Sequence, residues 1–376
     1  MDDVVIVGAG PAGSIAALVL ARAGVRVRLL DRARFPRDKL CGDTVNPGAM
    51  DILARLGLAS VTANALPVAG MIVTDGAGVR CVGRYANGRR GRALRRAVLD
   101  HALLDAAIDA GAAFDERVIV RGPCVDGQDV KGVSVAGLNG ADRRIPARIV
   151  IAADGASSRL ARALSLAGHS QRPRRWAVGA YFDGVRNEAD NEVLGEMHIR
   201  PGRYLGIAPM PGGITNACVV TADRAALRDP RTLLCEAFHR DPIVCDRFER
   251  ATLLAAPVCL GPLAVESSAS GVRGLLLAGD AAGFIDPMTG DGLRFAFRGA
   301  ELAASLALAA LCNGQTNVHR DLHRARRREF APKWRFNKLL RALVSSPRSV
   351  KIASRGATWS PTLLQHVIQY AGDARG

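Results

Sequence analysis

The most constraining feature of this sequence is a glycine-rich turn near its start. A short β-branched run over 4–7 leads directly into Gly8-Ala9-Gly10-Pro11-Ala12-Gly13. Residues 14–23 are apolar on all sides and stop at Gly24, which predicts a buried helix ended by a glycine. Residues 25–30 predict a second strand, which ends at Asp31. The order strand, turn, helix, strand predicts a βαβ unit.

Each glycine of this turn has a physical task. Gly8 permits the tight turn, Gly10 lets the backbone approach a pyrophosphate, and Gly13 lets the helix pack closely on the strand. Free N–H groups at the helix N-terminus favour the phosphates. Asp31 lies 18 residues after Gly13, where a carboxylate can accept hydrogen bonds from an adenosine ribose. The unit predicts dinucleotide binding, and alone it does not separate NAD, NADP and FAD.

A second strand that ends in an acid stands near the other end of the chain. The apolar run 274–278 leads into Gly279-Asp280-Ala281-Ala282-Gly283. Residues 293–311 then have a helical, alanine-rich pattern, so residues 289–292 would form the approach to that helix. Taken alone, this segment is typical of any strand-to-helix turn in an α/β domain.

The charge of the chain is concentrated in its last segment. The net charge is +16, and twelve basic residues lie between Arg320 and Arg355 against two acidic ones. Nucleic-acid binding is not expected, because aromatic residues make up 5% of the chain and do not interleave with the basic ones. We expect a helix over 320–370 that packs on the substrate lobe with a solvated basic face. A membrane surface or an acidic carrier protein, contacted through 320–355, are the alternatives.

The cysteines and the apolar runs exclude several other classes. The eight cysteines form no C-x-x-C pair and no zinc-type spacing, so neither a metal site nor a disulfide framework is expected. The longest nearly apolar run, 302–312, is shorter than the ~18 residues of a spanning helix. The start lacks the basic region of a signal peptide. We therefore expect a cytoplasmic protein, and the alternative is a protein in peripheral contact with a membrane.

Four separated motifs carry a family resemblance. They are the 8–13 turn with Asp31, the segment Phe35-Pro36-Arg37-Asp38-Lys39-Leu40-Cys41-Gly42, the turn Ala153-Asp154-Gly155-Ala156-Ser157-Ser158-Arg159, and the segment Gly279–Gly292. In this order they resemble the FAD-binding motifs of the geranylgeranyl reductase family. That family lies within the aromatic-hydroxylase-like flavoproteins, which have the para-hydroxybenzoate hydroxylase fold. The resemblance covers residues 1 to about 312.

The resemblance implies FAD as the cofactor and a role for several residues. Asp280 would accept a hydrogen bond from a ribityl hydroxyl, and the helix that begins near Gly290 would point its N–H groups at the pyrimidine edge of the flavin. Arg96 would reach the cofactor from a helix. The implied cofactor contacts are Gly8, Gly10, Pro11, Ala12, Gly13, Asp31, Arg32, Cys41, Gly42, Arg96, Asp154, Gly279, Asp280, Gly290, Asp291, Gly292 and Leu293.

Three of these residues have competing interpretations. Arg96 would otherwise be a solvated charge on its helix. In the resembling reductases the cysteine that matches Cys41 lies beside the flavin, where it would shape the pocket or donate a proton. Free cysteine is more often a small buried hydrophobe, so Cys41 is a candidate catalytic residue with a structural alternative. Asp154 ends a predicted strand over 149–153 and is expected to close the cofactor lobe rather than to take part in catalysis.

Three positions bear on which reaction the flavin supports. Hydroxylases of the superfamily usually carry His where this chain has Gly283, Asn where it has Arg294, and Arg where it has Ala161. These departures favour reduction of a carbon–carbon double bond by hydride transfer. An aromatic or polyketide monooxygenase and a non-catalytic flavin-fold protein remain the alternatives. Halogenation is disfavoured because the W-x-W-x-I-P motif is missing and no lysine lies between Lys39 and Lys131.

The predicted substrate lobe departs from the prenyl reductases as well. Their Y-x-W-x-F-P pattern keeps only Tyr204 and Pro209 here, with Gly206 and Ala208 in place of the two rings. Losing two large rings would widen or reshape the pocket, which puts geranylgeranyl lipids in doubt as the substrate. We expect an apolar or aromatic small molecule. Since no second nucleotide fingerprint is present, NAD(P)H or another reductant would visit transiently.

These observations predict the following organisation. The fold class is α/β, with a Rossmann-like FAD-binding lobe on a parallel sheet and an α+β substrate lobe on a mostly antiparallel sheet, followed by a C-terminal helical segment. The predicted FAD-binding lobe comprises 1–70, 95–165 and 270–318. The predicted substrate lobe comprises 71–94 and 166–269, and the basic helical segment is 319–376.

Overall fold

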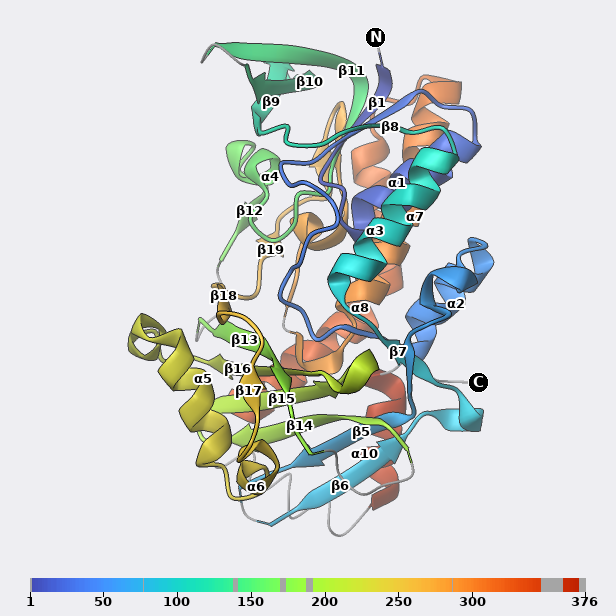
Figure 1. Cartoon of the computed structure of the whole chain (residues 1–376). Helices are drawn as coiled ribbons and strands as arrows, with labels where there is room; N and C mark the ends of the chain where they lie inside the picture. The colour runs from blue at the N-terminus through green and yellow to red at the C-terminus, as the bar shows by residue number, and fades with distance from the viewer. Residues whose placement is uncertain are drawn as a thin grey trace.

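Two sheets, one mostly parallel and one mostly antiparallel, organise this chain. The computed structural model describes residues 2–76, 78–137, 141–169, 174–186, 192–285, 287–345 and 361–371. The parallel sheet and its helices lie at one end of the molecule, and the antiparallel sheet lies at the other (Figure 1). The predicted fold class is confirmed, including the helical C-terminal segment.

The first sheet has the order β20-β21-β11-β1-β2-β8, with the hairpin β9-β10 added to β11. The pairs β21/β11, β11/β1, β1/β2 and β2/β8 are parallel, whereas β20 and the hairpin pair in antiparallel fashion. The strands are β1 (Asp2–Val7), β2 (Val27–Leu30), β8 (Ala113–Asp115), β9 (Val120–Asp126), β10 (Asp129–Ala136), β11 (Asp142–Ala152), β20 (Gly271–Val272) and β21 (Leu275–Leu277).

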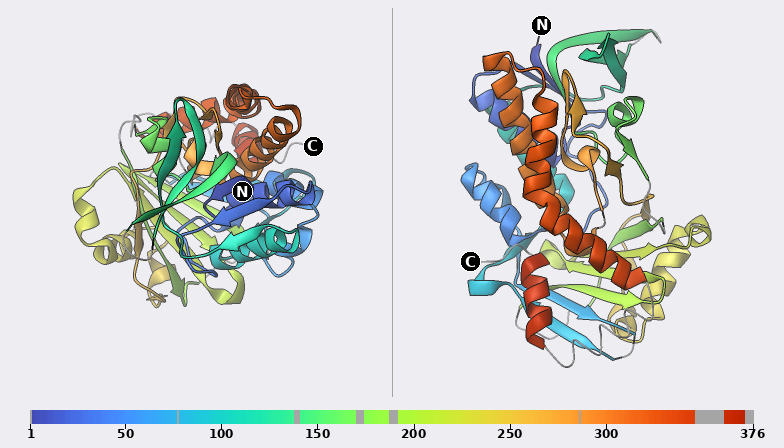
Figure 2. Two further views of the ribbon diagram at one scale, coloured as in Figure 1. Left: turned by 90° about the horizontal axis from the view of Figure 1, so that it is seen from above. Right: turned by 180° about the vertical axis from the view of Figure 1, so that it is seen from behind.

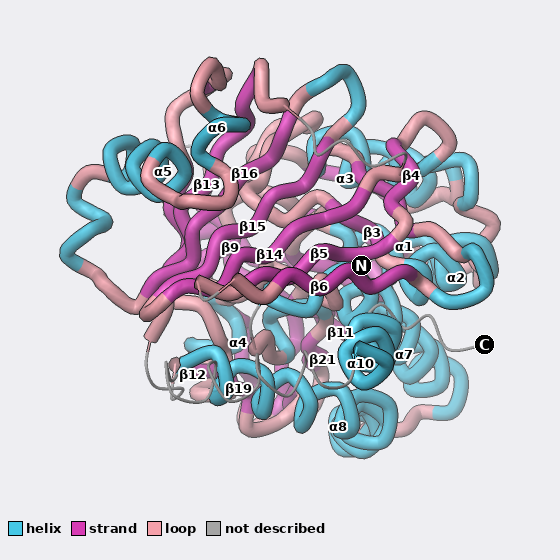
Figure 3. The backbone as a smooth tube through the Cα atoms, turned by 90° about the horizontal axis from the view of Figure 1, so that it is seen from below, coloured by secondary structure: helices cyan, strands magenta, loops and turns pink. Residues whose placement is uncertain are grey.

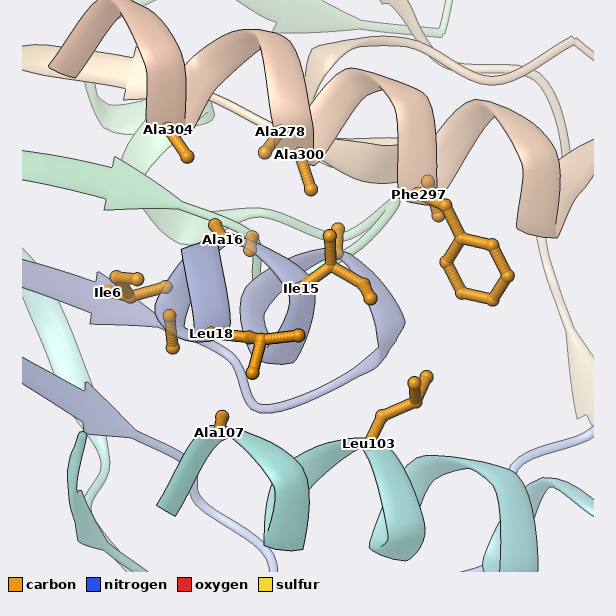
Figure 4. Close-up of a cluster of buried hydrophobic side chains, with 14 of the residues drawn as sticks. Ile6, Ile15, Ala16, Leu18, Leu103, Ala107, Ala278, Phe297, Ala300 and Ala304 are labelled. Carbon is orange, nitrogen blue, oxygen red and sulfur yellow. The ribbon is translucent and has the colours of Figure 1, made fainter. Parts of the chain in front are cut away.

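Both faces of the parallel core are buried, as its continuous apolar strands require. On one face Ile6 and its even-numbered neighbours pack against three helices, α1 (Pro11–Arg22), α3 (Arg96–Asp109) and α7 (Gly292–Asn313). On the other face Val5 and Val7 pack against the β9-β10 hairpin and α4 (Arg159–Ala163). Figure 4 shows α1 between α3 and α7, with the small side chains of Ala16, Ala300 and Ala304 where α1 and α7 meet.

The expected elements differ from the observed ones mainly at their ends. The first helix begins at Pro11 rather than at residue 14, because Gly10 is its N-cap and proline suits the first helical position. The second strand begins at Val27 rather than at residue 25. The 293–311 helix extends over Gly292–Asn313. The expected lobe boundaries stay a prediction.

Helix α7 is longer than the apolar run in its sequence suggests. Its 22 residues are apolar enough to cross a membrane by length and composition. In the fold, however, residues such as Phe297 and Ala300 lie fully buried in the core between α1 and the parallel sheet. The packing of α7 is that of a core helix.

The second sheet has the order β17-β13-β16-β15-β14-β5-β6, and β18 also pairs with β13. All of its pairs are antiparallel except β14/β5, which is parallel. Its strands are β5 (Gly70–Thr74), β6 (Arg80–Arg84), β13 (Trp176–Asp183), β14 (Leu194–Arg200), β15 (Arg203–Pro209), β16 (Thr215–Thr221), β17 (Thr252–Leu253) and β18 (Val258–Leu260).

Different elements cover the two faces of this sheet (Figure 3). Val178, Leu205 and Val219 pack against α5 (Pro230–His239) and α6 (Cys245–Phe248). Tyr204, Met197 and other residues of the opposite face pack against Leu40, Met288 and Leu340, which come from outside the sheet. This second face, here called the inner face, therefore looks towards the parallel half of the molecule.

Short elements join the two sheets. The strands β3 (Thr44–Val45), β4 (Leu66–Val68) and β7 (Gly91–Ala93) form a small sheet beside α2 (Pro47–Arg55), which begins two residues after β3. A further antiparallel pair, β12 (Ala167–Gly168) and β19 (Glu266–Ser267), lies between the two sheets in Figure 1. The small β3-β7-β4 sheet therefore ties segments of both predicted lobes together.

The C-terminal helices correct one expectation. Helix α8 (Val318–Ser345) extends along both halves of the molecule, as the right panel of Figure 2 shows, and α10 (Pro361–Ala371) packs on β6. Instead of facing solvent, the basic side chains Arg326, Lys333 and Arg341 are buried. They occupy the inward stripe of the helix, where buried acids and carbonyl groups bind them. Residues 346–360 of the basic segment lie outside the described residues.

Candidate functional site

The glycine-rich turn fits the spacing that its sequence predicts. Gly8 has φ +99°, and a Cβ there would lie 2.5 Å from the Ala153 carbonyl oxygen. A Cβ at Gly13 would overlap the Gly8 carbonyl oxygen. At Gly10, by contrast, a Cβ would meet only Arg37 Nη2, at 3.3 Å. The outer glycines are therefore required by the fold itself, whereas Gly10 leaves backbone open to a ligand.

Asp31 holds this turn in place. Its Oδ2 accepts a hydrogen bond from Ala9 N at 2.8 Å, and its Oδ1 accepts one from Ala33 N at 2.8 Å. The carboxylate keeps lone pairs beyond these two bonds, so a hydrogen bond from a ribose hydroxyl stays a prediction. Arg32, the next residue, is exposed.

The second glycine-acid motif lies directly against the first turn of α1. The turn η5 (Gly279–Ala282) follows β21, and a Cβ at Gly279 would lie 2.8 Å from Ala12 Cβ. Because β1 and β21 run parallel on either side of β11, their carboxyl ends reach the same edge of the sheet. Asp280 and Gly10 are thus brought together at one crevice, as ligand sites of open α/β sheets require.

The start of α7 forms the next wall. Gly290 has φ +66° and nothing within 4 Å of a Cβ position, and the α7 N-cap, Asp291, makes no side-chain cap. The Asp291 carboxylate instead accepts hydrogen bonds from Lys333 Nζ and Asn46 Nδ2, both at 3.2 Å. Leu293 is buried in the core. Asp291 and Leu293 could therefore meet a cofactor only through their backbone.

The Asn46 bond also brings the cysteine segment to the start of α7. Asn46 caps α2 by accepting a hydrogen bond from Ala49 N at 2.9 Å, and it lies a few residues after Cys41 and Gly42. Gly42 is exposed and has nothing within 4 Å of a Cβ position. The Cys41-Gly42 and Gly290–Gly292 segments therefore approach the same space from two sides.

Arg96 links the cysteine segment to the nucleotide end of the crevice. It is buried at the first position of α3 and binds both Asp100 oxygens, at 2.7 and 2.8 Å. Arg37, beside Gly10, also pairs with Asp100 at 3.2 Å. Burial disfavours the Arg96 charge, but Asp100 and a hydrogen bond with the Cys41 side chain outweigh it, so the pKa of Arg96 is raised. The contact of Arg96 with a cofactor stays a prediction.

Sequence reasoning missed a buried acid next to the cysteine. Asp43 is 1% exposed and has φ +51°, an uncommon value for a residue with a side chain. Its Oδ2 accepts hydrogen bonds from Tyr181 Oη and Asn216 Nδ2, both at 2.6 Å. Burial raises the pKa of Asp43 to about 6, against the lowering effect of those bonds and of Arg96. The available signal was its position directly after Cys41-Gly42.

Three of the four predicted pocket residues share the inner face of the second sheet. Tyr204, Gly206 and Ala208 alternate along β15, whereas Pro209 has the opposite register. Gly206 lies opposite Cys218, and Cys218 lies opposite Gly179 on β13. This row of small residues leaves a low floor on the inner face. A Cβ at Gly179 would lie 2.7 Å from Leu40, so the cysteine segment covers part of that floor.

Asp154, the last predicted site residue, contacts the start of α4. Asp154 Oδ2 accepts a hydrogen bond from Arg159 N at 2.8 Å, which orders the start of α4, and burial raises the pKa of Asp154. Among the described residues, no group of three or more His, Cys, Asp or Glu side chains could hold a metal ion. All eight cysteines are free.

The residues along the crevice fit FAD. The N-termini of α1 and α7 lack side-chain caps, so their N–H groups are available to phosphate and to a ring carbonyl. The backbone is open at Gly10, Gly42 and Gly290, where a Cβ would intrude on a flat or charged ligand. Contacts of Arg37, Arg96 and the Cys41 segment connect the nucleotide turn to the inner face of the second sheet, so one end suits a dinucleotide and the other a redox partner.

Comparison with known proteins agrees with this geometry. The model of the FAD binding domain family matches residues 1–334. Menaquinone reductase of Mycobacterium tuberculosis is 32% identical over 321 residues, covering 81% of this chain and 76% of that protein. Digeranylgeranylglycerophospholipid reductase of Methanosarcina acetivorans is 28% identical over 324 residues, covering 85% of this chain and 78% of that protein.

Two other similar proteins are not named as reductases. Conditioned medium factor receptor 1 of Dictyostelium discoideum is 31% identical over 86% of this chain, which spans 66% of that protein. The solved structure of the flavin-dependent brominase Bmp2 matches with a TM-score of 0.86 at 20% identity, covering 99% of this chain and 93% of that chain. A likeness at this identity shows the fold alone.

A substitution at Gly10 separates cofactor binding from folding. Gly10→Val should leave the apoprotein folded, because a side chain there meets only the movable end of Arg37. It should weaken FAD binding at least about 100-fold, since the new side chain occupies the approach to the turn. Fluorescence titration with FAD and thermal unfolding of the apoprotein measure the two effects. Equal FAD affinity in Gly10→Val and wild type would contradict the assignment of this turn.

The environment of Asp43 predicts a pH-dependent stability. Because its folded pKa is about 6 against an ordinary 3.8, the unfolded chain ionises first as pH rises, and stability is lost between about pH 4 and 6. Asp43→Asn has no such loss. Its free energy of unfolding relative to wild type should therefore rise by up to about 3 kcal/mol from pH 4 to 7. Urea unfolding of the apoproteins measures this, with exposed Asp126→Asn as control; a difference constant with pH would refute it.

Proposed function

This chain belongs to the FAD binding domain family and is an FAD-dependent oxidoreductase, and we propose that it reduces a carbon–carbon double bond of a hydrophobic small molecule. When bound and reduced, FAD supplies the hydride for such a reaction. The proposal is supported chiefly by the similarity to two proteins named as reductases, and by the inner face of Gly206 and Ala208, to which Asn216 fixes the Cys41 segment. We propose a reduced nicotinamide as the transient electron donor.

The chain's own residues would bind and orient the reactants. The α1 N-terminus would hold the pyrophosphate, and Asp280 would accept a hydrogen bond from the ribityl chain. The α7 N-terminus, held by Lys333 and Asn46 through Asp291, would present N–H groups to the ring. The Leu40, Met288 and Leu340 side chains would keep water from the far side of the floor.

The substrate we propose is a prenyl lipid or a prenylated quinone. Two similar proteins are named as reductases of a digeranylgeranylglycerophospholipid and of menaquinone. The missing rings at Gly206 and Ala208 make the floor of this pocket lower, which suits a bulkier head group than a bare prenyl chain needs. An aromatic or polyketide substrate for monooxygenation is the second candidate, supported by the same open floor.

Anaerobic turnover tests this function. The FAD-loaded protein, reduced with an equimolar amount of dithionite, should be reoxidised by a prenylated quinone in detergent micelles. After air has returned any quinol to the quinone, mass spectrometry should show a product still heavier by two hydrogens, because only reduction of a carbon–carbon double bond survives that step. The Gly206→Trp variant, which fills the floor, should slow this at least about tenfold. Substrate-dependent oxygen consumption with an oxygen-containing product would instead establish the monooxygenase, and would contradict the reductase proposal.

We propose that α8 places the protein on an anionic membrane surface. Its exposed basic side chains lie on one stripe of the helix, opposite the buried Arg326, Lys333 and Arg341. Leu339, on the edge of this stripe, is 68% exposed. Basic residues near anionic lipid contribute about 1 kcal/mol each. The exposed members are Arg320, Arg324, Arg327, Arg328, Arg335 and Lys338.

Vesicle binding tests the membrane proposal. Wild type should bind phosphatidylserine vesicles in low salt and release them in high salt. Reversing Arg324, Arg327 and Arg328 to Glu should abolish binding, because about 1 kcal/mol per basic residue is lost and repulsion is added. Reversing three exposed arginines of the β9-β10-β11 region, Arg121, Arg143 and Arg144, provides a control of equal charge. Equal loss in both variants would show that only net charge matters and would contradict a specific α8 surface.

A further inference from the structure

The reduction proposed above requires a proton as well as a hydride, and the contacts around Asp43 point to its source. Adding hydrogen across a double bond places a hydride on one carbon and a proton on the other. Cys41, the candidate from the sequence, binds the Arg96 guanidinium, a group without an acceptor and without a proton to release near neutral pH. A second candidate acid lies on the pocket side of the cysteine segment.

Tyr181 lies on the inner face beside the pocket floor. It is paired across the sheet with Asn216, and Asn216 is paired with Ala208, so the three form one row on that face. Neighbouring strands lie about 4.8 Å apart, which places Tyr181 two strands from Ala208. Tyr181 is partly exposed, and the Arg95 guanidinium lies over its ring at 4.7 Å. Tyr181 therefore shares the inner face with Gly206 and Ala208, on the strand that also carries Gly179.

Asp43 is built to exchange a proton with that phenol. Both of its hydrogen bonds converge on Oδ2, one of them from Tyr181 Oη at 2.6 Å, while Oδ1 is buried without a partner among the described residues. An ionised carboxylate with a buried oxygen that accepts no hydrogen bond is energetically unfavourable. Protonation of the carboxyl group removes much of this desolvation penalty. The uncommon left-handed backbone of Asp43 shows that the fold maintains this position against strain.

We propose that Tyr181 is the proton donor of the double-bond reduction and that Asp43 positions and reprotonates it. This inference rests on the proposed function. In the neutral state Asp43 can donate its proton from Oδ2 to Tyr181 Oη, which leaves the phenol hydrogen free to point at the pocket. The substrate carbon that does not receive the hydride takes this hydrogen as a proton. The Tyr181 oxygen takes the Asp43 proton, and solvent returns one proton to Asp43.

The charges around the pair support this direction of transfer. Burial and the neighbouring Asp43 raise the pKa of the Tyr181 phenol, so it holds its proton until a strong base, such as the developing carbanion, takes it. The hydride carries both electrons of the reduction. A reduced nicotinamide would then return two electrons to the flavin. The titratable and charged groups facing the pair are Asp38 and Cys41 from the same segment, Arg95 and Arg96 at the start of α3, and Cys218 on β16.

Stopped-flow kinetics test the pair with a digeranylgeranylglycerophospholipid in detergent micelles as the probe. FAD-loaded, dithionite-reduced wild type should be reoxidised at a rate that falls above about pH 6, because the ionised Asp43 accepts the phenol hydrogen and holds it. Tyr181→Phe should slow reoxidation at least about 100-fold, with FAD affinity unchanged. Asp43→Asn should lose the decline above pH 6. Tyr370→Phe, which removes a phenol hydroxyl on α10, should behave as wild type.

A measurement without flavin separates the proton pair from the proposed function. Infrared titration of the apoprotein should show a buried carboxylic acid that ionises near pH 6 and is absent in Asp43→Asn. Wild type that fails to reduce the probe refutes the proposed function and the inference with it. Reduction by wild type that continues at full rate in Tyr181→Phe, or a carboxyl already ionised at pH 5, overturns the proton pair alone.

Discussion

The close packing of two strand-to-helix turns is the constraint on which the rest of this structure depends. Gly279, after β21, lies against Ala12 in the first turn of α1 so tightly that a Cβ would be 2.8 Å away. Small residues at both positions, and alanines where α1 meets α7, permit this approach (Figure 4). Two helix N-termini and an acid from remote parts of the chain consequently face one crevice. Larger side chains at these contacts would separate the two halves of that crevice.

Polar contacts carry this arrangement from the nucleotide turn to the second sheet. Arg37, beside Gly10, shares Asp100 with Arg96, and Arg96 in turn meets Cys41. Asn216 donates a hydrogen bond to the Cys41 carbonyl oxygen at 2.6 Å, which fixes the cysteine segment to the inner face. Since these polar groups are mostly buried, each needs its neighbour as a hydrogen-bond or ion-pair partner. Loss of one would leave the neighbouring charge or polar group buried without a partner. The cysteine segment is in this sense the joint between cofactor and substrate regions.

The sequence was sufficient to predict the fold of the parallel half because its signals are local. Gly8, Gly13 and Gly279 are required by backbone contacts that follow directly from strand-turn-helix geometry, so their spacing predicts the fold. The roles of Asp291 and Arg326 could not be predicted in this way. Asp291 is bound by Lys333 from α8, and Arg326 donates a hydrogen bond to the Ala282 carbonyl oxygen at 3.1 Å. Both contacts depend on where a distant, strongly basic helix folds back. Its composition suggested a solvated surface.

The substrate half was predictable only in outline. The Y-x-W-x-F-P resemblance indicated Tyr204, Gly206 and Ala208 as pocket residues, but the pairing that adds Gly179, Tyr181 and Asn216 to their face is a property of the sheet order. The central claim, that one FAD lies between the Gly10 turn and the inner face, is tested most directly by a crystal structure of the FAD-loaded protein. The pyrophosphate should lie at Gly10 and the flavin ring between Gly42 and Gly290. A flavin ring bound elsewhere, with this space filled by side chains, would contradict it.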